Sequence, residues 1–180
     1  TSLGDWMIAP KKLPNGIRPL IDLAHNNGMK FGIWIEPEMV NTPSELYEKH
    51  PDWVLRHPDF EPTYGRGKTQ LILDLTNPEV QDHVFKVVDD LLTAYPDIYY
   101  IKWDNNMEMF NASSLYLPKA LQSNLQVEFT LALEKILKRI RAKYPNVVMQ
   151  LCASGGTRLN YGFMPYFQEM WTSDQTDALH

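Results

Sequence analysis

Short runs of apolar, β-forming residues alternate with helical segments along this chain, and this alternation limits the folds that the chain can adopt. Apolar, β-forming residues cluster at residues 30–35, 70–75, 98–101 and 147–151. Segments with apolar residues at helical spacing separate them, at residues 17–27, 44–49, from 76 onward and 118–143. Strands that alternate with helices in this way form parallel sheets, because a helical crossover returns the chain to the same edge of the sheet.

The number of such units favours a closed architecture. Several strand–helix units in one direction are typical of an α/β fold of the (β/α)8 TIM-barrel type with parallel strands. No GxGxxG motif follows a strand, and the glycine pair Gly155-Gly156 lacks that spacing, so a nucleotide-binding sheet is excluded. A complete barrel needs about 250 residues, and this chain has 180. We therefore expect residues 1–180 to be part of one catalytic β/α-barrel domain, a partial barrel truncated at both ends.

Polar side chains follow the predicted strands at the points where the apolar runs end. They are Glu36, Glu38, Asp74, Lys102, Asp104, Cys152, Arg158 and Asp174. In a β/α barrel the carboxyl ends of the strands meet at one face, and active sites lie there. We therefore expect these side chains to surround one pocket.

The stretch from Ile98 to Asn106 carries the strongest candidate in this group. Lys102 lies two residues before Asp104, so on a strand both point to the same side. A nearby ammonium favours an ionised carboxylate, which a nucleophile requires. A single aspartate at a strand end can equally cap the next turn, but the similar ends of the other strands favour a catalytic role.

Indole rings accompany the polar strand ends, at Trp6, Trp34, Trp103 and Trp171. The apolar face of a sugar ring stacks on aromatic rings while its hydroxyls bind charged groups, so this combination indicates carbohydrate. Glycoside hydrolysis needs two carboxyl groups with different roles. Asp104 suits the nucleophile, and Asp174, in an aromatic and weakly polar setting, suits the general acid; Asp177 competes for that second role.

The composition limits the other kinds of partner. A net charge of -5 and the lack of a Lys/Arg block argue against nucleic acid. No apolar run approaches the roughly 18 residues of a membrane span, and the first residues do not form a signal peptide, which favours a cytoplasmic location. The single cysteine, Cys152, excludes an internal disulfide, and no Cys/His group has zinc-ligand spacing, so we expect no metal and no cofactor.

The motifs, in their order along the chain, resemble those of glycoside hydrolase family 36. The segments that carry the resemblance are Gly4-Asp5-Trp6, Trp34-Ile35-Glu36-Pro37-Glu38-Met39, Tyr64-Gly65-Arg66, Lys102-Trp103-Asp104, Cys152-Ala153-Ser154-Gly155-Gly156-Thr157-Arg158 and Trp171-Thr172-Ser173-Asp174-Gln175-Thr176-Asp177. The family consists of retaining α-galactosidases with a β/α-barrel catalytic domain, whose members often form homo-oligomers. The resemblance implies hydrolysis of terminal α-galactosides of the raffinose or melibiose type.

The resemblance also assigns roles to individual residues. It makes Asp104 the nucleophile and Asp174 the acid/base. The positions that match the family's substrate pocket are Asp5, Trp34, Arg66, Lys102, Cys152, Gly155 and Trp171. Three departures stand out: the aspartate-rich motif expected before Gly4 is absent, the loop after Arg66 is longer, and Asn160 replaces an aspartate that is frequent in the family.

Alternatives use the same residues. An α-N-acetylgalactosaminidase or a galactosyl transferase could share the scaffold. Carboxylates of Glu36, Asp74 and Asp104 could instead hold Mg²⁺ in an enolase-like barrel with Lys102 as base, although the tryptophans would then have no task. The chain could also be an inactive barrel fragment that keeps the catalytic pair but lacks groups that bind galactose.

Overall fold

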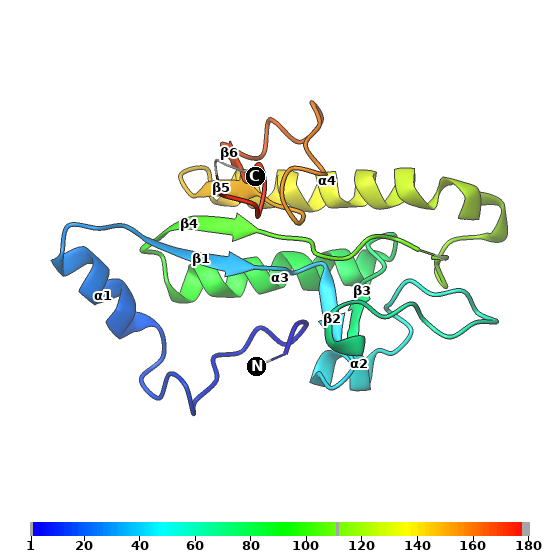
Figure 1. Ribbon diagram of the computed structural model, residues 1–180, viewed down its shortest axis with the longest axis horizontal. Helices are drawn as coiled ribbons and strands as arrows, with labels where there is room; N and C mark the ends of the chain where they lie inside the picture. The colour runs from blue at the N-terminus through cyan, green and yellow to red at the C-terminus, as the bar shows by residue number, and fades with distance from the viewer. Residues whose placement is uncertain (1, 111, 178–180) are drawn as a thin grey trace.

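Four parallel strands form the central sheet of the computed structural model, which describes residues 2–110 and 112–177 (Figure 1). The spatial order is β1 (Phe31–Ile35), β4 (Ile98–Trp103), β5 (Val148–Leu151) and β6 (Glu169–Met170), and every neighbouring pair is parallel. The α/β class and the strands predicted near residues 30–35, 98–101 and 147–151 are therefore confirmed.

The run at residues 70–75 does not join this sheet, and the prediction that it would is wrong. β3 (Gln70–Ile72) pairs antiparallel with β2 (Met39–Asn41) in a separate two-stranded sheet. A parallel neighbour needs a crossover long enough to span the sheet. Between β2 and β3 the chain contains the five-residue helix α2 (Glu45–Lys49), the short 3₁₀ turn η1 (Arg66–Lys68) and otherwise irregular segments. None of these is a long crossover helix, and β3 runs back antiparallel beside β2.

Three helices precede strands of the parallel sheet. α1 (Arg18–Asn26) leads to β1, α3 (Pro78–Ala94) to β4, and α4 (Leu125–Lys143), preceded by the 3₁₀ turn η2 (Lys119–Asn124), to β5. α3 begins where the side chain of Asn77 accepts the backbone N–H of Glu79 and a proline occupies the first turn. The helix predicted to open at Pro118 thus starts as a 3₁₀ turn.

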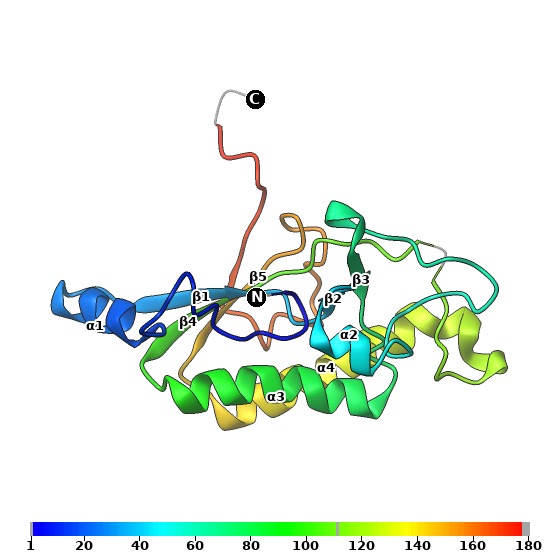
Figure 2. The same cartoon turned by 90° about the horizontal axis from the view of Figure 1, so that it is seen from below.

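α3 and α4 pack against the same face of the sheet (Figure 2). The buried side of α3 carries Val80, Val84, Val88 and Leu92, which recur every four residues. From β4, Ile101 and Trp103 are fully buried, whereas Lys102 between them points to the opposite face. Strand alternation therefore separates a packed apolar face from a second, polar one.

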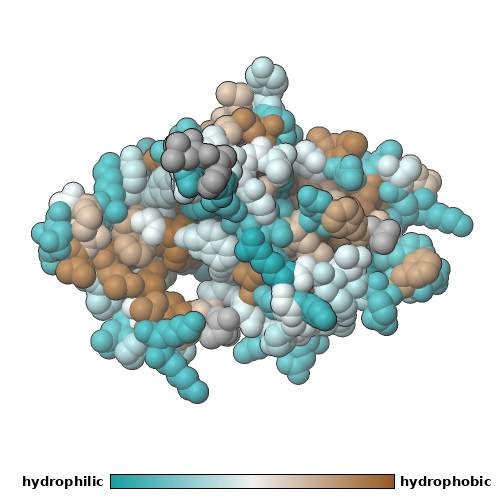
Figure 3. All heavy atoms as spheres, viewed as in Figure 1, coloured by the Kyte–Doolittle hydropathy of each residue, from teal (hydrophilic) through white to brown (hydrophobic). Residues whose placement is uncertain are grey.

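The second face lies uncovered by α3 and α4, and the C-terminal segment leaves from it (Figure 2). Its side chains are hydrogen-bonded to each other: the hydroxyl of Tyr100 donates to Glu169 at 2.8 Å. Figure 3 views this side, and brown, apolar residues gather toward the end at α1. Leu20 and Leu23 of α1 are exposed, as is Met29, which follows the helix. In the described part of the chain, none of the helices has the length and apolarity needed to cross a membrane.

The packing of α4 yields a test of the fold. Ile136 is fully buried on α4, whereas Leu131 on the same helix is 45% exposed. Replacing Ile136 with alanine removes buried methyl groups and leaves a cavity, so Ile136→Ala is expected to lower the free energy of unfolding by about 2–5 kcal/mol. Leu131→Ala is the matched control, expected to change it by less than about 0.5 kcal/mol. Thermal and denaturant unfolding of the two variants measure this, and equal midpoints would contradict the packing.

Candidate active site

Asp104 lies one residue beyond the end of β4 and is only 6% exposed. Its backbone N–H donates to the carbonyl of Ile35 at 2.8 Å, which continues the pairing of β4 with β1. The carboxylate accepts hydrogen bonds on both oxygens: the indole Nε1–H of Trp34 donates to Oδ2 at 2.9 Å, and the N–H of Asn105 donates to Oδ1 at 2.9 Å. The side chains of Asn106 and Cys152 also hydrogen-bond to it.

These donors decide the charge of the group. Burial by itself raises the pKa of Asp104, but the hydrogen bonds outweigh burial and leave the pKa below its ordinary value. Asp104 is therefore ionised at neutral pH although it is almost fully buried. The expected stabiliser was the ammonium of Lys102, whereas the groups in contact with the carboxylate are neutral donors.

Lys102 connects Asp104's strand to the segment that carries Asp174. Its ammonium lies 4.4 Å from the centroid of the Trp171 ring, within the range of a cation–π interaction. The indole Nε1–H of Trp171 in turn donates to Oδ1 of Asp174 at 2.9 Å. Asp174 is exposed to solvent. Asp174 is thus linked through Trp171 to Lys102, which lies on the strand that leads to Asp104, and the separation of Asp174 from Asp104 stays a prediction.

The segment after β5 brings Cys152 and Gly155 to the same place. Cys152 is buried and unpaired, and its backbone N–H donates to the carbonyl of Trp103 at 2.8 Å. Burial raises the pKa of its thiol, and the hydrogen bond to Asp104 acts in the same direction, so the neutral thiol is the donor. Gly155 adopts a φ of +101°, and an added Cβ would lie 3.1 Å from the carbonyl oxygen of Thr172. The Asp174 segment therefore packs directly on a position that only glycine fits.

Arg66 reaches the site from the other direction. It lies in η1, where it is exposed, and its Nη2 is 3.5 Å from Oδ1 of Asn106. The hydroxyl of Ser154 donates to the same oxygen at 3.0 Å. Asn106 therefore links the loops that follow β4 and β5 with the turn that precedes β3, so Arg66 contacts a residue two positions after Asp104.

Asp5 is placed apart from this group. Its carboxylate oxygens accept the backbone N–H groups of Glu45 and Leu46, at 3.2 and 3.0 Å, so it caps the N-terminus of α2. Its neighbour Trp6 is the residue of this motif nearest the site, with its ring 6.0 Å from that of Trp34. A substrate-binding role for Asp5 stays a prediction that these contacts do not favour.

Asp74 also lies outside the group, and the expectation that it would join the others is corrected. It follows the antiparallel strand β3, and its two oxygens are hydrogen-bonded to the side chains of Thr76 and Ser114. Within residues 2–110 and 112–177, no three or more His, Cys, Asp or Glu side chains gather closely enough to hold a metal ion. The carboxylate set of the enolase-like alternative is therefore not assembled.

Glu36 and Glu38, by contrast, are in place beside Asp104 and almost fully buried. Glu38 forms an ion pair with Arg158 at 2.8 Å, which confirms that the ends of β1 and β5 converge. Burial raises the pKa of Glu36, and the negative charge of Asp104 adds to that effect. Sequence reasoning missed Asn105 and Asn106 as functional residues; their position directly after Asp104 in a polar strand end was the available signal.

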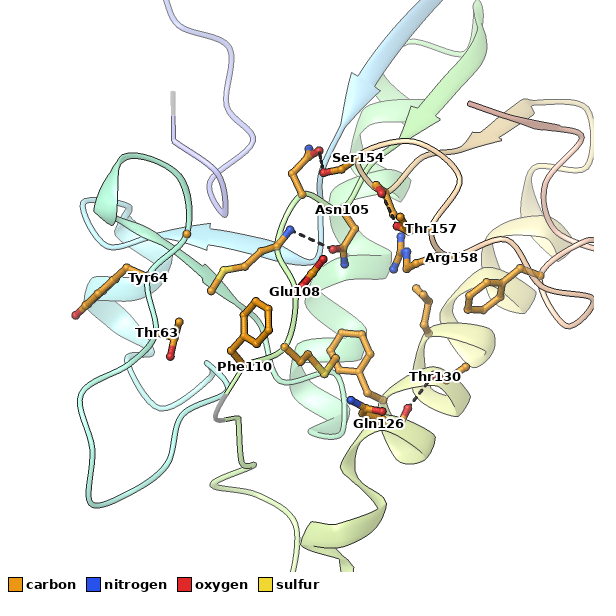
Figure 4. A pocket seen from close by; sticks show the side chains of 18 residues that line it. Thr63, Tyr64, Asn105, Glu108, Phe110, Gln126, Thr130, Ser154, Thr157 and Arg158 are labelled. Atoms are coloured by element: carbon orange, nitrogen blue, oxygen red, sulfur yellow. Dashed lines mark hydrogen bonds between the residues drawn. The ribbon is translucent and has the colours of Figure 1, made fainter. Parts of the chain in front are cut away.

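A cavity of about 740 Å³ opens beside these residues, on the side toward α4 (Figure 4). Asn105, Ser154 and Arg158 line one side of it, and Gln126 and Thr130 of α4 line another. Asp104 does not line it, although its chain neighbour Asn105 does. Of the strand-end side chains expected to surround one pocket, Arg158 lines this cavity. The buried carboxylate of Asp104, the indoles and cations near it and the exposed Asp174 are the kinds of group that bind a sugar and attack its anomeric carbon.

Comparison with known proteins identifies the family of this chain. A family model described as Melibiase matches residues 1–180. Alpha-galactosidase 2 of Pediococcus pentosaceus is 41% identical over 177 residues, which cover 98% of this chain and 24% of that protein. Alpha-galactosidase AgaA of Geobacillus stearothermophilus is 39% identical over 178 residues, 99% of this chain and 24% of that protein. The chain therefore spans about a quarter of the length of these relatives.

Solved structures match equally well. The alpha-galactosidase from Lactobacillus brevis superposes with a TM-score of 0.93 at 41% identity, over 99% of this chain and 24% of that one. A variant of the GH36 alpha-galactosidase AgaA, solved in complex with raffinose, superposes with a TM-score of 0.92 at 38% identity, over the same shares of the two chains. The chain belongs to the melibiase family, within glycoside hydrolase family 36.

Proposed function

We propose that the protein containing this chain hydrolyses terminal α-galactosidic bonds of raffinose- or melibiose-type oligosaccharides, with retention of configuration. Residues 1–180 would form part of its catalytic (β/α)8 barrel, in which the polar face of the sheet lines the interior. The observation that carries the proposal is the carboxylate of Asp104, buried at the end of β4 and held by donors on both oxygens.

The mechanism is a double displacement. Asp104 attacks the anomeric carbon and forms a covalent galactosyl-enzyme, while Asp174 protonates the leaving oxygen. Asp174 then deprotonates the water that releases galactose from Asp104. In retaining enzymes the two carboxyl groups lie about 5 Å apart, which is the separation we expect with substrate bound. The exposure of Asp174 suits this role, because the acid/base must exchange protons with the leaving group and with water.

The neighbouring residues suit a galactoside. Trp34 and Trp171 offer ring faces on which the apolar side of the sugar can stack. Arg66 and Lys102 provide cations for its hydroxyls. Cys152 hydrogen-bonds to Asp104, and Gly155 lies against Thr172 and Ser173, just before Asp174. The names of the relatives support the substrate class: they are alpha-galactosidases, and AgaA variants were solved with raffinose and with stachyose.

The first test assigns the two carboxylates separately. Asp104→Ala and Asp174→Ala, made in the natural protein, are each expected to lower kcat/KM for raffinose by at least about 10³-fold. Azide should distinguish them with p-nitrophenyl α-galactoside as substrate. It attacks the galactosyl-enzyme of Asp174→Ala and gives the α-azide, but attacks the substrate directly in Asp104→Ala and gives the β-azide.

The exposed Asp52→Asn is the control, expected to retain full activity. Product azides are assigned by their anomeric NMR couplings. An Asp104→Ala variant that keeps its hydrolytic activity would refute the nucleophile, and a natural protein inactive on α-galactosides would refute the function.

The pH dependence tests the electrostatics of Asp104. Trp34→Phe keeps a ring but removes the N–H that donates to Oδ2, so it should raise the pKa of Asp104. The protonated, inactive form then appears at higher pH, and the acid limb of kcat/KM should move upward by about one pH unit.

Trp171→Phe is the matched control for this experiment, because the indole of Trp171 donates to Asp174 and not to Asp104. Its acid limb should stay where it is in the natural protein. An unmoved limb in Trp34→Phe, or an equal shift in both variants, would contradict the role given to Trp34.

A further inference from the structure

Two buried glutamates next to the site have no task in the proposed reaction. Glu36 and Glu38 flank Pro37 in the turn that follows β1, and they are 2% and 0% exposed. Removing a carboxylate from water costs several kcal/mol unless donors and opposite charges compensate. Two such groups within three residues therefore need specific partners.

Glu38 is hydrogen-bonded to both chain neighbours of Asp104. The indole Nε1–H of Trp103 donates to Oε1 at 2.8 Å, and the side-chain amide of Asn105 donates to Oε2 at 3.2 Å. Glu38 thus binds the residue before Asp104 and the residue after it.

Glu36 binds the next residue along. Its Oε1 accepts the backbone N–H of Asn106 at 2.6 Å and the side-chain amide of Gln70 at 3.1 Å. Asn105 and Asn106, which the glutamates hold, are themselves donors to Asp104: the first through its backbone N–H, the second through its side chain. The contacts therefore run from the turn, through two asparagines, to the carboxylate.

Arg158 completes the arrangement from the segment after β5. Its Nη1 donates to both oxygens of Glu38, at 2.9 and 2.8 Å. One glutamate side chain is thereby bonded to the ends of β4 and β5 while its own backbone follows β1. The hydrogen-bonded carboxylate of Glu38 therefore fixes the ends of β1, β4 and β5 relative to each other.

We infer that Glu36 and Glu38 are positioning residues, which hold the Asp104-Asn105-Asn106 segment so that the carboxylate of Asp104 faces the anomeric carbon. The inference rests on the proposed function and adds to it the residues that orient the carboxylate of Asp104. The hydrogen bonds of the glutamates reach Asp104 through its neighbours Trp103, Asn105 and Asn106.

Glu38→Gln tests this in the natural protein. The amide preserves the volume, but its NH₂ must face either Trp103 and Arg158 or Asn105 and Arg158, all of which are donors. Loosening the segment should lower kcat for p-nitrophenyl α-galactoside on the order of 10- to 100-fold, with KM changed less than about threefold. The acid limb of kcat/KM should also move to higher pH, because the donors to Asp104 are less well placed.

Asp74→Asn is the matched control. Asp74 is buried to the same degree, and its carboxylate is equally satisfied, but by Thr76 and Ser114. It should lower the thermal midpoint while leaving kcat and the acid limb unchanged. If the two variants lose kcat equally at matched stability, the glutamate acts through stability alone and the inference is wrong.

Asn105→Ala provides a second variant should Glu38→Gln fail to fold. It removes the amide that reaches Glu38 but keeps the backbone N–H that donates to Asp104, and Glu38 retains Trp103 and Arg158. It should reduce kcat and shift the acid limb in the same direction as Glu38→Gln. Folded variants with the kcat and acid limb of the natural protein would overturn the inference while leaving the glycosidase intact; a natural protein without α-galactosidase activity would overturn both.

Discussion

The desolvated carboxylate of Asp104 is the constraint on which the rest of the site depends. A buried charge is stable only where donors surround it, and here they come from the ends of three strands: Trp34 from β1, Asn105 from β4 and Cys152 from β5. The lowered pKa of Asp104 therefore depends on the register of the three strands, which brings all of these donors to one carboxylate, more than on any single donor. A shift of one strand relative to the others would remove a donor and raise the pKa of Asp104.

Parallel pairing makes that convergence possible. β1, β4, β5 and β6 point in one direction, so their carboxyl ends meet at one edge, and the crossover helices α3 and α4 occupy one face of the sheet. The other face keeps polar side chains such as Lys102 and Tyr100, which neither helix covers. The same topology thus gives the sheet one face that packs on helices and a second face that carries polar side chains.

The sequence predicted the parts of this arrangement that depend on local pattern. The run before Lys102-Trp103-Asp104 is a strand because β-forming residues end abruptly in a polar cluster. The pattern of apolar residues does not show which strands pair, so it does not show that Gln70–Ile72 pairs antiparallel with β2 outside the parallel sheet. It also does not reveal tertiary donors: Asp5 caps α2, and the roles of Asn105 and Asn106 depend on contacts with residues about 70 positions earlier in the chain.

The most direct test of the account is to identify the residue that becomes galactosylated. A fluorinated galactosyl fluoride that forms the galactosyl-enzyme quickly and releases it slowly would be incubated with the natural protein, followed by peptic digestion and mass spectrometry. We expect one galactosyl adduct, on the peptide that contains Asp104 and localised to that residue by fragmentation. An adduct on Glu36 or Asp174, or steady turnover without any covalent adduct, would contradict Asp104 as the buried nucleophile.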